Sequence, residues 1–123
     1  MFFLANLHKK PGISLYFLTK KDISNLHKKY FSNPEPTDCI TLPYEDPTFL
    51  GEIFVCPEIA SEYVKFKGGN LDEEITLYVV HGFLHLIGYI DTEDSSKKMM
   101  RKEEKIHLKR LSEANLRIKV VQC

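Results

Sequence analysis

Two histidines four positions apart, His81 and His85, are the residues of this sequence best suited to chemistry, and Asp91 follows them. Residues four apart in a helix lie about one turn apart on one side, so both imidazoles can reach one ion. Gly88 follows where a glycine can adopt the left-handed conformation that ends a helix. A carboxylate beyond that turn can supply a third ligand and leave the fourth position of a tetrahedral zinc open to water. The sequence therefore predicts a zinc site of His81, His85 and Asp91.

The plainer interpretation is a pair of core histidines whose ring nitrogens are satisfied by hydrogen bonds, followed by an ordinary helix end. A histidine pair at this spacing is by itself a weak indication of a metal. The surrounding residues favour the metal, because burying two titratable rings without a partner costs free energy. From Ile75 to Ile87 nearly every residue is apolar, which predicts a helix buried on all sides. Asn70 and Glu73 are typical of the start of that helix.

The elements around this helix are expected to form an α+β fold, in which helices pack around a small mixed β-sheet. Runs of apolar and aromatic residues predict strands at Ile13–Thr19, Thr37–Leu42 and Leu50–Cys56. Pro43 is expected to stop the second strand, with a loop at 44–49. Capping residues and proline predict helices from Thr19 or Asp22 to Tyr30, from Pro57 to Lys65, and from after residues 92–96 to about Ala114. Residues 1–11 are expected to be a short helix or an irregular lead-in.

Length and charge indicate one domain over residues 1–123, without a strong field for nucleic acid. The chain has 17 basic and 17 acidic residues, so its formal net charge is zero. Any RNA contact must therefore come from a local patch. The last predicted helix interleaves lysine and arginine with glutamate, which is typical of a solvated face, and a basic RNA-facing stripe is the alternative. His107 lies in this helix and is not expected to be a ligand.

Cysteine use and hydropathy indicate a cytoplasmic protein. Cys39, Cys56 and Cys123 are too few and too scattered for a disulfide framework, which fits a reducing compartment. The apolar start lacks a basic leader and is too short for a signal peptide. No stretch is long enough to span a membrane, so no membrane partner is expected.

The segment from His81 to Tyr89, HGFLHLIGY, resembles the HGxLHLxGYDH signature of the YbeY family, bacterial zinc-dependent endoribonucleases. PTDCITLP at 36–43 and LGEI at 50–53 are similar to that family's PTDVLSFP and LGDI, and the order and spacing agree from about Ile13 to Leu111. The resemblance implies a zincin-like metal-hydrolase fold with one zinc ion per chain. It also implies cleavage of ribosomal RNA in rRNA maturation and ribosome quality control, with the small ribosomal subunit or its assembly factors as partners.

The match to the family's third zinc ligand departs from the signature. His81 and His85 match two ligands, whereas Ile90 and Asp91 replace the family's Asp-His pair. Asp91 stands at the third-histidine position, and a carboxylate is an acceptable zinc ligand. A slip of one residue would instead place Glu93 or Asp94 at the metal. The chain also starts later than its relatives, so we expect an initial helix or strand to be missing.

A second departure lies at Phe31, where the family carries an arginine that the resemblance assigns to holding the phosphate. Lysine only partly replaces a bidentate guanidinium, and Lys28 and Lys29 are the candidates for this substrate contact. No general acid or base is obvious, and Glu52 and Asp38 are the candidates if the fold brings either near the zinc.

Two other functions compete with the endoribonuclease. The spacing HxxxHxxGxxD is similar to a metallopeptidase motif, but those enzymes need a glutamate directly after the first histidine, and this chain has Gly82. The other alternative is a non-catalytic RNA- or ribosome-binding module with a degenerate metal site. The changes at Ile90, Asp91 and Phe31 are the reason to consider it.

Overall fold

The structure is a computed structural model, and it describes residues 12–114. Within this range the elements are β1 (Gly12–Phe17), α1 (Lys20–Phe31), β2 (Cys39–Asp46), β3 (Phe49–Val55), α2 (Pro57–Lys67), α3 (Leu71–Leu86) and α4 (Asp94–Glu113). The predicted α+β class is confirmed, and each predicted helix and strand from Ile13 onward has a counterpart. The lead-in predicted at 1–11 lies outside the described residues.

The three strands form one mixed sheet in the order β1-β3-β2, with β1 parallel and β2 antiparallel to β3. The prediction that Pro43 stops the second strand and that residues 44–49 form a loop is wrong, because β2 continues to Asp46. The position of Pro43 on an edge strand explains why the strand continues. An edge strand tolerates a proline whose nitrogen lies on the unpaired side, and the register of the ladder becomes irregular only between Pro43 and Asp46.

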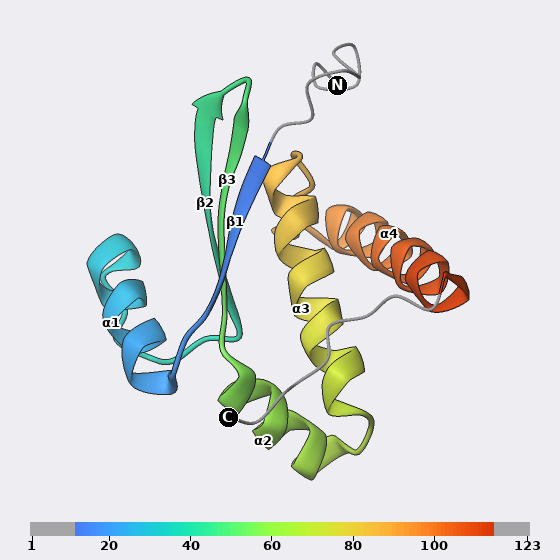
Figure 1. Cartoon of the computed structure of the whole chain (residues 1–123), viewed down its shortest axis with the longest axis horizontal. Coiled ribbons are helices and arrows are strands. Elements are labelled where there is room, and N and C mark those ends of the chain that lie inside the picture. Colours follow the sequence, from blue (N-terminus) through green and yellow to red (C-terminus); the bar gives the residue numbers. More distant parts are fainter. Residues whose placement is uncertain (1–11, 115–123) are drawn as a thin grey trace.

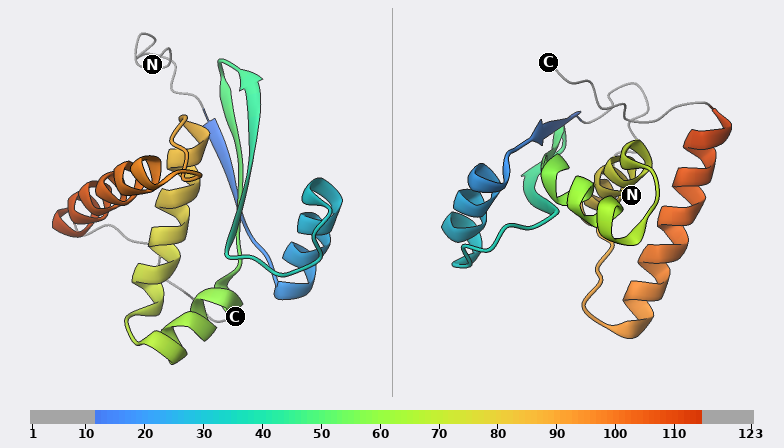
Figure 2. Two further views of the ribbon diagram at one scale, coloured as in Figure 1. Left: turned by 180° about the vertical axis from the view of Figure 1, so that it is seen from behind. Right: turned by 90° about the horizontal axis from the view of Figure 1, so that it is seen from below.

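Helices cover both faces of the sheet. Figure 1 shows α1 on one side of the strands and α3 on the other, with α4 outside α3. The views from behind and from below in Figure 2 show the same layers. Ile53 and Val55 of β3 pack in one cluster with Ile75 of α3, whereas Phe54 packs in a second cluster with Ile23 of α1. This alternation along β3 follows from the two-residue period of a strand.

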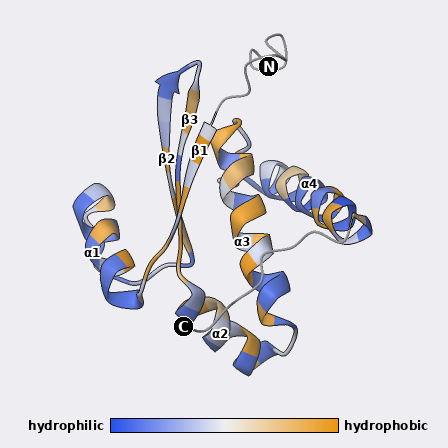
Figure 3. Cartoon of the chain, in the orientation of Figure 1, coloured by the Kyte–Doolittle hydropathy of each residue, from blue (hydrophilic) through white to orange (hydrophobic). Residues whose placement is uncertain are grey.

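The histidine helix α3 is the most buried helix, as predicted. It is hydrophobic along most of its length, whereas α4 is mostly hydrophilic (Figure 3). Asn70 caps α3 by accepting a hydrogen bond from the Glu73 N–H at 3.1 Å. A Cβ atom at Gly82 would lie 2.7 Å from Ile53 Cγ2 and 3.0 Å from Cys39 Sγ, so only glycine lets α3 approach the sheet this closely. No helix within residues 12–114 is both long and apolar enough to cross a membrane.

Candidate metal centre

Each of the two histidines has one ring nitrogen fixed by a hydrogen-bond acceptor. His85 Nδ1 lies 3.0 Å from the Tyr89 carbonyl oxygen, and His81 Nδ1 lies 2.5 Å from Glu104 Oε2. A carbonyl and an ionised carboxylate only accept hydrogen bonds, so Nδ1 carries the hydrogen in both neutral rings. Both Nε2 atoms therefore present lone pairs, and they face each other 3.0 Å apart.

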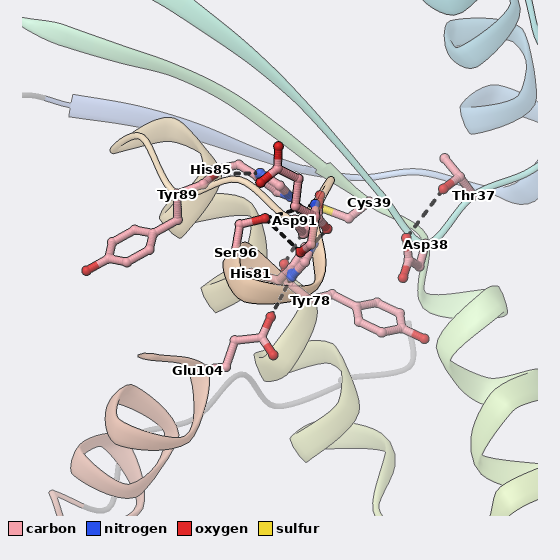
Figure 4. Close-up of polar contacts among 11 residues, drawn as sticks. Thr37, Asp38, Cys39, Tyr78, His81, His85, Tyr89, Asp91, Ser96 and Glu104 are labelled. Carbon is pink, nitrogen blue, oxygen red and sulfur yellow. Dashed lines mark hydrogen bonds and ion pairs between the residues drawn. The ribbon is translucent and has the colours of Figure 1, made fainter. Parts of the chain in front are cut away.

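Asp91 completes a three-donor group with the two imidazoles (Figure 4). Its Oδ2 lies 3.6 Å from His81 Nε2 and 3.5 Å from His85 Nε2. Three electron-pair donors thus converge without a hydrogen atom between them. Their lone pairs repel one another, and a bound cation would remove this repulsion. Ligands about 2.0–2.2 Å from a tetrahedral zinc lie about 3.3–3.6 Å from one another, close to the two distances of Asp91 Oδ2. The residues present therefore fit a metal ion.

The turn after α3 brings Asp91 back to the histidines. Gly88 has φ 109°, a conformation that favours glycine, and its N–H donates to the His85 carbonyl at 3.1 Å. The next N–H, of Tyr89, donates to Leu84 O at 3.0 Å, which reverses the chain. This reversal also places the Tyr89 carbonyl where it accepts from His85. The predicted helix end therefore positions one ligand and orients another.

The alternative third ligands have other roles. Glu93 is the N-cap of α4 and forms a capping box with Ser96, whose Oγ accepts from the Glu93 N–H at 3.0 Å. Asp94 is the first residue of α4. Among residues 12–114, the acid that groups with the two imidazoles is Asp91.

Glu104 of α4 supports the centre, although it is not among the site residues predicted from sequence. Its side chain is only 14% exposed and makes the hydrogen bond to His81 Nδ1. A carboxylate in this position fixes the tautomer and the orientation of a ligating histidine and makes it a stronger base. A signal was present, because Glu104 lies four residues after the buried Met100 and four before Leu108, on the apolar side of an otherwise charged helix.

Two cavities share the His81 side chain as a lining residue. One, of about 360 Å³, is also lined by Asp91 and Glu104 and by two cations one turn apart on α4, Lys97 and Arg101. Neither cation forms an ion pair with another residue of the described range, so both remain available to an anion. The second cavity, of about 320 Å³, is lined by His27 and Phe31 of α1, Cys39 and Thr41 of β2, and both histidines.

The two candidates for a general acid or base, Asp38 and Glu52, lie in different places relative to the centre. Asp38 lines the first cavity, and Figure 4 shows it across from the three ligands, where it accepts from the Thr37 hydroxyl at 3.3 Å. Glu52 lies on the opposite face of the sheet from α3, because its neighbour Ile53 faces α3. There it accepts from the Tyr44 hydroxyl at 2.7 Å, which raises the pKa of Tyr44.

The two lysines proposed to contact substrate are exposed residues of the last turn of α1. Neither Lys28 nor Lys29 lines the two cavities at the centre, whereas Phe31 lines the second one. The lysine and arginine side chains that line these two cavities, Lys97 and Arg101, come from α4. The basic face of that helix, which the sequence left open as either a solvated face or an RNA-facing stripe, therefore contributes to the cavity.

Cys39 borders the second cavity as a thiol. Its Sγ donates to the Tyr78 carbonyl at 3.6 Å, and burial, together with the nearby Asp38 charge, raises the pKa of Cys39 to about 12. The thiolate needed for metal binding or nucleophilic attack is therefore disfavoured near neutral pH.

The fold and this group define a small α+β protein with a candidate metal centre on its buried helix. The sequence model of the family described as Endoribonuclease YbeY matches residues 3–112. A protein from Protochlamydia amoebophila, named Endoribonuclease YbeY, is 41% identical over 112 residues, which cover 87% of this chain and 75% of that protein. The chain belongs to the YbeY family.

Two further comparisons agree with this assignment. A protein of the same name from Chlamydia trachomatis serovar D is 39% identical over 108 residues, covering 82% of this chain and 67% of that protein. The solution structure of TM1509 from Thermotoga maritima superposes with a TM-score of 0.68 at 26% identity, over 92% of this chain and 77% of that one. Together the family and its named members support an RNA endonuclease role.

Proposed function

We propose that this chain is a zinc-dependent endoribonuclease that cleaves ribosomal RNA during rRNA maturation and ribosome quality control. Its site of action would be the cytoplasm, and its partners would be the small ribosomal subunit or its assembly factors. One observation carries the proposal. The Nε2 atoms of His81 and His85 and a carboxylate oxygen of Asp91 converge without a hydrogen atom between them, in a chain whose named relatives are endoribonucleases.

His81, His85 and Asp91 would hold the zinc, which supplies Lewis acidity for phosphodiester cleavage. Glu104 keeps the Nε2 lone pair of His81 directed at the centre through its bond to Nδ1. Two neutral imidazoles and one carboxylate leave a less positive site than three imidazoles would. Lys97 and Arg101 line the adjoining cavity and would restore positive charge where a phosphate must lie.

Packing at Gly82 opposes the metallopeptidase alternative. That chemistry requires a glutamate at this position to take a proton from water. A side chain at position 82 would meet Ile53 and Cys39 of the sheet at 3.0 Å or less. A glutamate there would disrupt the contact between α3 and the sheet, so this chain is not built for that mechanism.

The test combines metal content and RNA cleavage in protein purified without chelator. We expect about one zinc per wild-type chain and its loss in His81→Ala, together with loss of ribosomal RNA cleavage. The matched control is His107→Ala, because His107 lies on α4, where its Nε2 is 3.6 Å from Glu103 Oε2, and outside the three-donor group. This variant should keep both zinc and cleavage.

Two results would contradict the proposal. If the wild-type protein contains no metal, and wild type and His81→Ala bind ribosomal RNA equally well, the chain is a non-catalytic ribosome-binding module. Hydrolysis of casein without cleavage of RNA would identify a peptidase.

A further inference from the structure

The second cavity crosses the outer edge of the sheet. Its walls are His27 and Phe31 of α1 on one side and the two ligand histidines of α3 on the other, with Cys39 and Thr41 of β2 between them. Within residues 12–114, β2 pairs with β3 alone and is therefore an edge strand. The cavity thus joins the metal centre to a strand edge and to the end of α1.

The backbone of β2 offers hydrogen-bonding groups to this cavity. The Cys56 N–H donates to the Asp38 carbonyl at 3.0 Å, which identifies Asp38 and Cys56 as a hydrogen-bonded pair across the two strands. Such pairs alternate with non-bonded pairs along an antiparallel ladder. Cys39 and Thr41 therefore turn their N–H and C=O groups away from β3. An N–H donor and a C=O acceptor at each of two positions suit the edge of a nucleobase, which carries both kinds of group.

Phe31 presents an aromatic ring to the same cavity. It is the last residue of α1 and is 54% exposed, and Ser32 follows in the left-handed conformation that ends the helix. The ring centroids of Phe31 and His27 are 5.5 Å apart, and His27 Nδ1 in turn donates to the Glu35 carbonyl at 2.7 Å. These contacts hold the Phe31 ring at the cavity while leaving about half of the side chain uncovered.

The chemistry of this wall favours a base over a phosphate. The C-terminal end of a helix carries partial negative charge, which disfavours an anion. A phenyl ring has no group that donates a hydrogen bond to a phosphate, but a base can stack on it. Lys28 and Lys29, exposed in the same helical turn, offset that negative charge and attract a polyanionic strand. The volume of about 320 Å³ lies at the lower end of small-ligand pockets, which run from roughly 300 to 1,000 Å³.

We propose that this cavity binds one unpaired RNA base, stacked on Phe31, with its edge hydrogen-bonded to the outward backbone groups of Cys39 and Thr41. The base belongs to a nucleotide beside the phosphodiester at the metal centre. This inference rests on the proposed function and adds a base contact to its substrate-binding site. An unpaired base is required because a base within a helix has no free face for the ring.

The test measures binding separately from cleavage. The probe is a short single-stranded RNA with 2′-O-methyl groups and one 2-aminopurine, added to the full chain in the presence of chelator. Stacking on Phe31 should quench the fluorescence of the 2-aminopurine. Phe31→Leu should abolish the quenching and weaken binding about 5- to 150-fold, the range for loss of one base–aromatic stack, whereas Phe31→Trp should retain both.

Phe66→Leu is the matched control, because Phe66 is 82% exposed beside Lys67 and lines neither cavity of the centre. It should bind the probe like wild type. Equal binding by Phe31→Leu and wild type would overturn the inference, as would an equal loss in Phe31→Trp or Phe66→Leu. An extended peptide that competes with the RNA and depends equally on Phe31 would reassign the cavity to a polypeptide strand.

Failure of the proposed function gives a different result. If no RNA is cleaved but quenching still depends on Phe31, the base site stands and the nuclease assignment falls. If ribosomal RNA is cleaved at the same rate and the same positions by Phe31→Leu, and the probe is not quenched by wild type, the nuclease stands and the base site falls.

Discussion

Replacing Glu104 with glutamine tests whether α4 takes part in the metal centre. The substitution keeps the size of the side chain and removes the negative charge of the carboxylate, which accepts a hydrogen bond from His81 Nδ1 at 2.5 Å. A hydrogen bond to a charged group contributes about 1.5–3 kcal/mol. Loss of a carboxylate that orients a ligating histidine costs about 10- to 100-fold in metal affinity, which is about 1.4–2.7 kcal/mol. The two ranges agree, so we expect zinc to bind Glu104→Gln about 10- to 100-fold more weakly.

The assay is competition for zinc between the protein and a chromophoric chelator, with the unfolding free energy of the metal-free protein measured alongside. Glu103→Gln is the matched control, because Glu103 is the adjacent residue of α4 and pairs with His107 instead of His81. The control should bind zinc like wild type. Equal zinc affinity of Glu104→Gln and wild type would refute the supporting role, and so would an equal loss in the control.

Three further perturbations follow from the structure. Asp91→Ala should lose more zinc affinity than the roughly 10- to 100-fold expected at Glu104, because it removes a ligand, whereas Asp91→His should retain zinc. If Asp91 were not a ligand, chelator competition would show the same zinc affinity for Asp91→Ala as for wild type. Gly82→Ala should lower the unfolding free energy by about 1–3 kcal/mol through overpacking against Ile53, and an unchanged urea midpoint would contradict this. Because burial raises the pKa of Cys39 from 9.0 to about 12, its contribution to stability is complete below pH 9 and is lost as the pH rises toward 12. Unfolding free energies between about pH 8 and 11 should therefore fall less steeply in Cys39→Ala, and equal slopes would contradict the shift.

The part of the site that lies within one stretch of chain was predictable from sequence. His81, His85 and Gly88 follow from the geometry of one helix and its end, and Asp91 lies just beyond that end. These relations are local, because the helical repeat and the conformational freedom of glycine act over a few residues. The buried character of α3 was predictable for the same reason, since its apolar residues leave no polar face.

The remainder depends on contacts between elements that sequence patterns do not fix. Glu104 is indistinguishable by sequence from the other charges of its helix, because the role of its carboxylate depends on the packing of α4 against α3 beside His81. Pro43 predicts a strand end, because the sequence does not show which side of β2 is unpaired. Glu52 is a candidate base by residue type, and only the alternation along β3 shows that it lies on the face away from α3. Each case turns on tertiary packing, which overrides the local preference of the residue.

The contact between His81 and Glu104 has a consequence for the way the protein comes apart. Met100 is the one residue of α4 that is buried, so apolar packing alone attaches this helix only modestly. An ion bound by α3 and the following turn would also fasten α4, through the imidazole and the carboxylate behind it. Stripping the ion should accelerate amide hydrogen exchange in α4 well before the central strand β3 loses protection, so that metal loading governs the integrity of one side of the molecule.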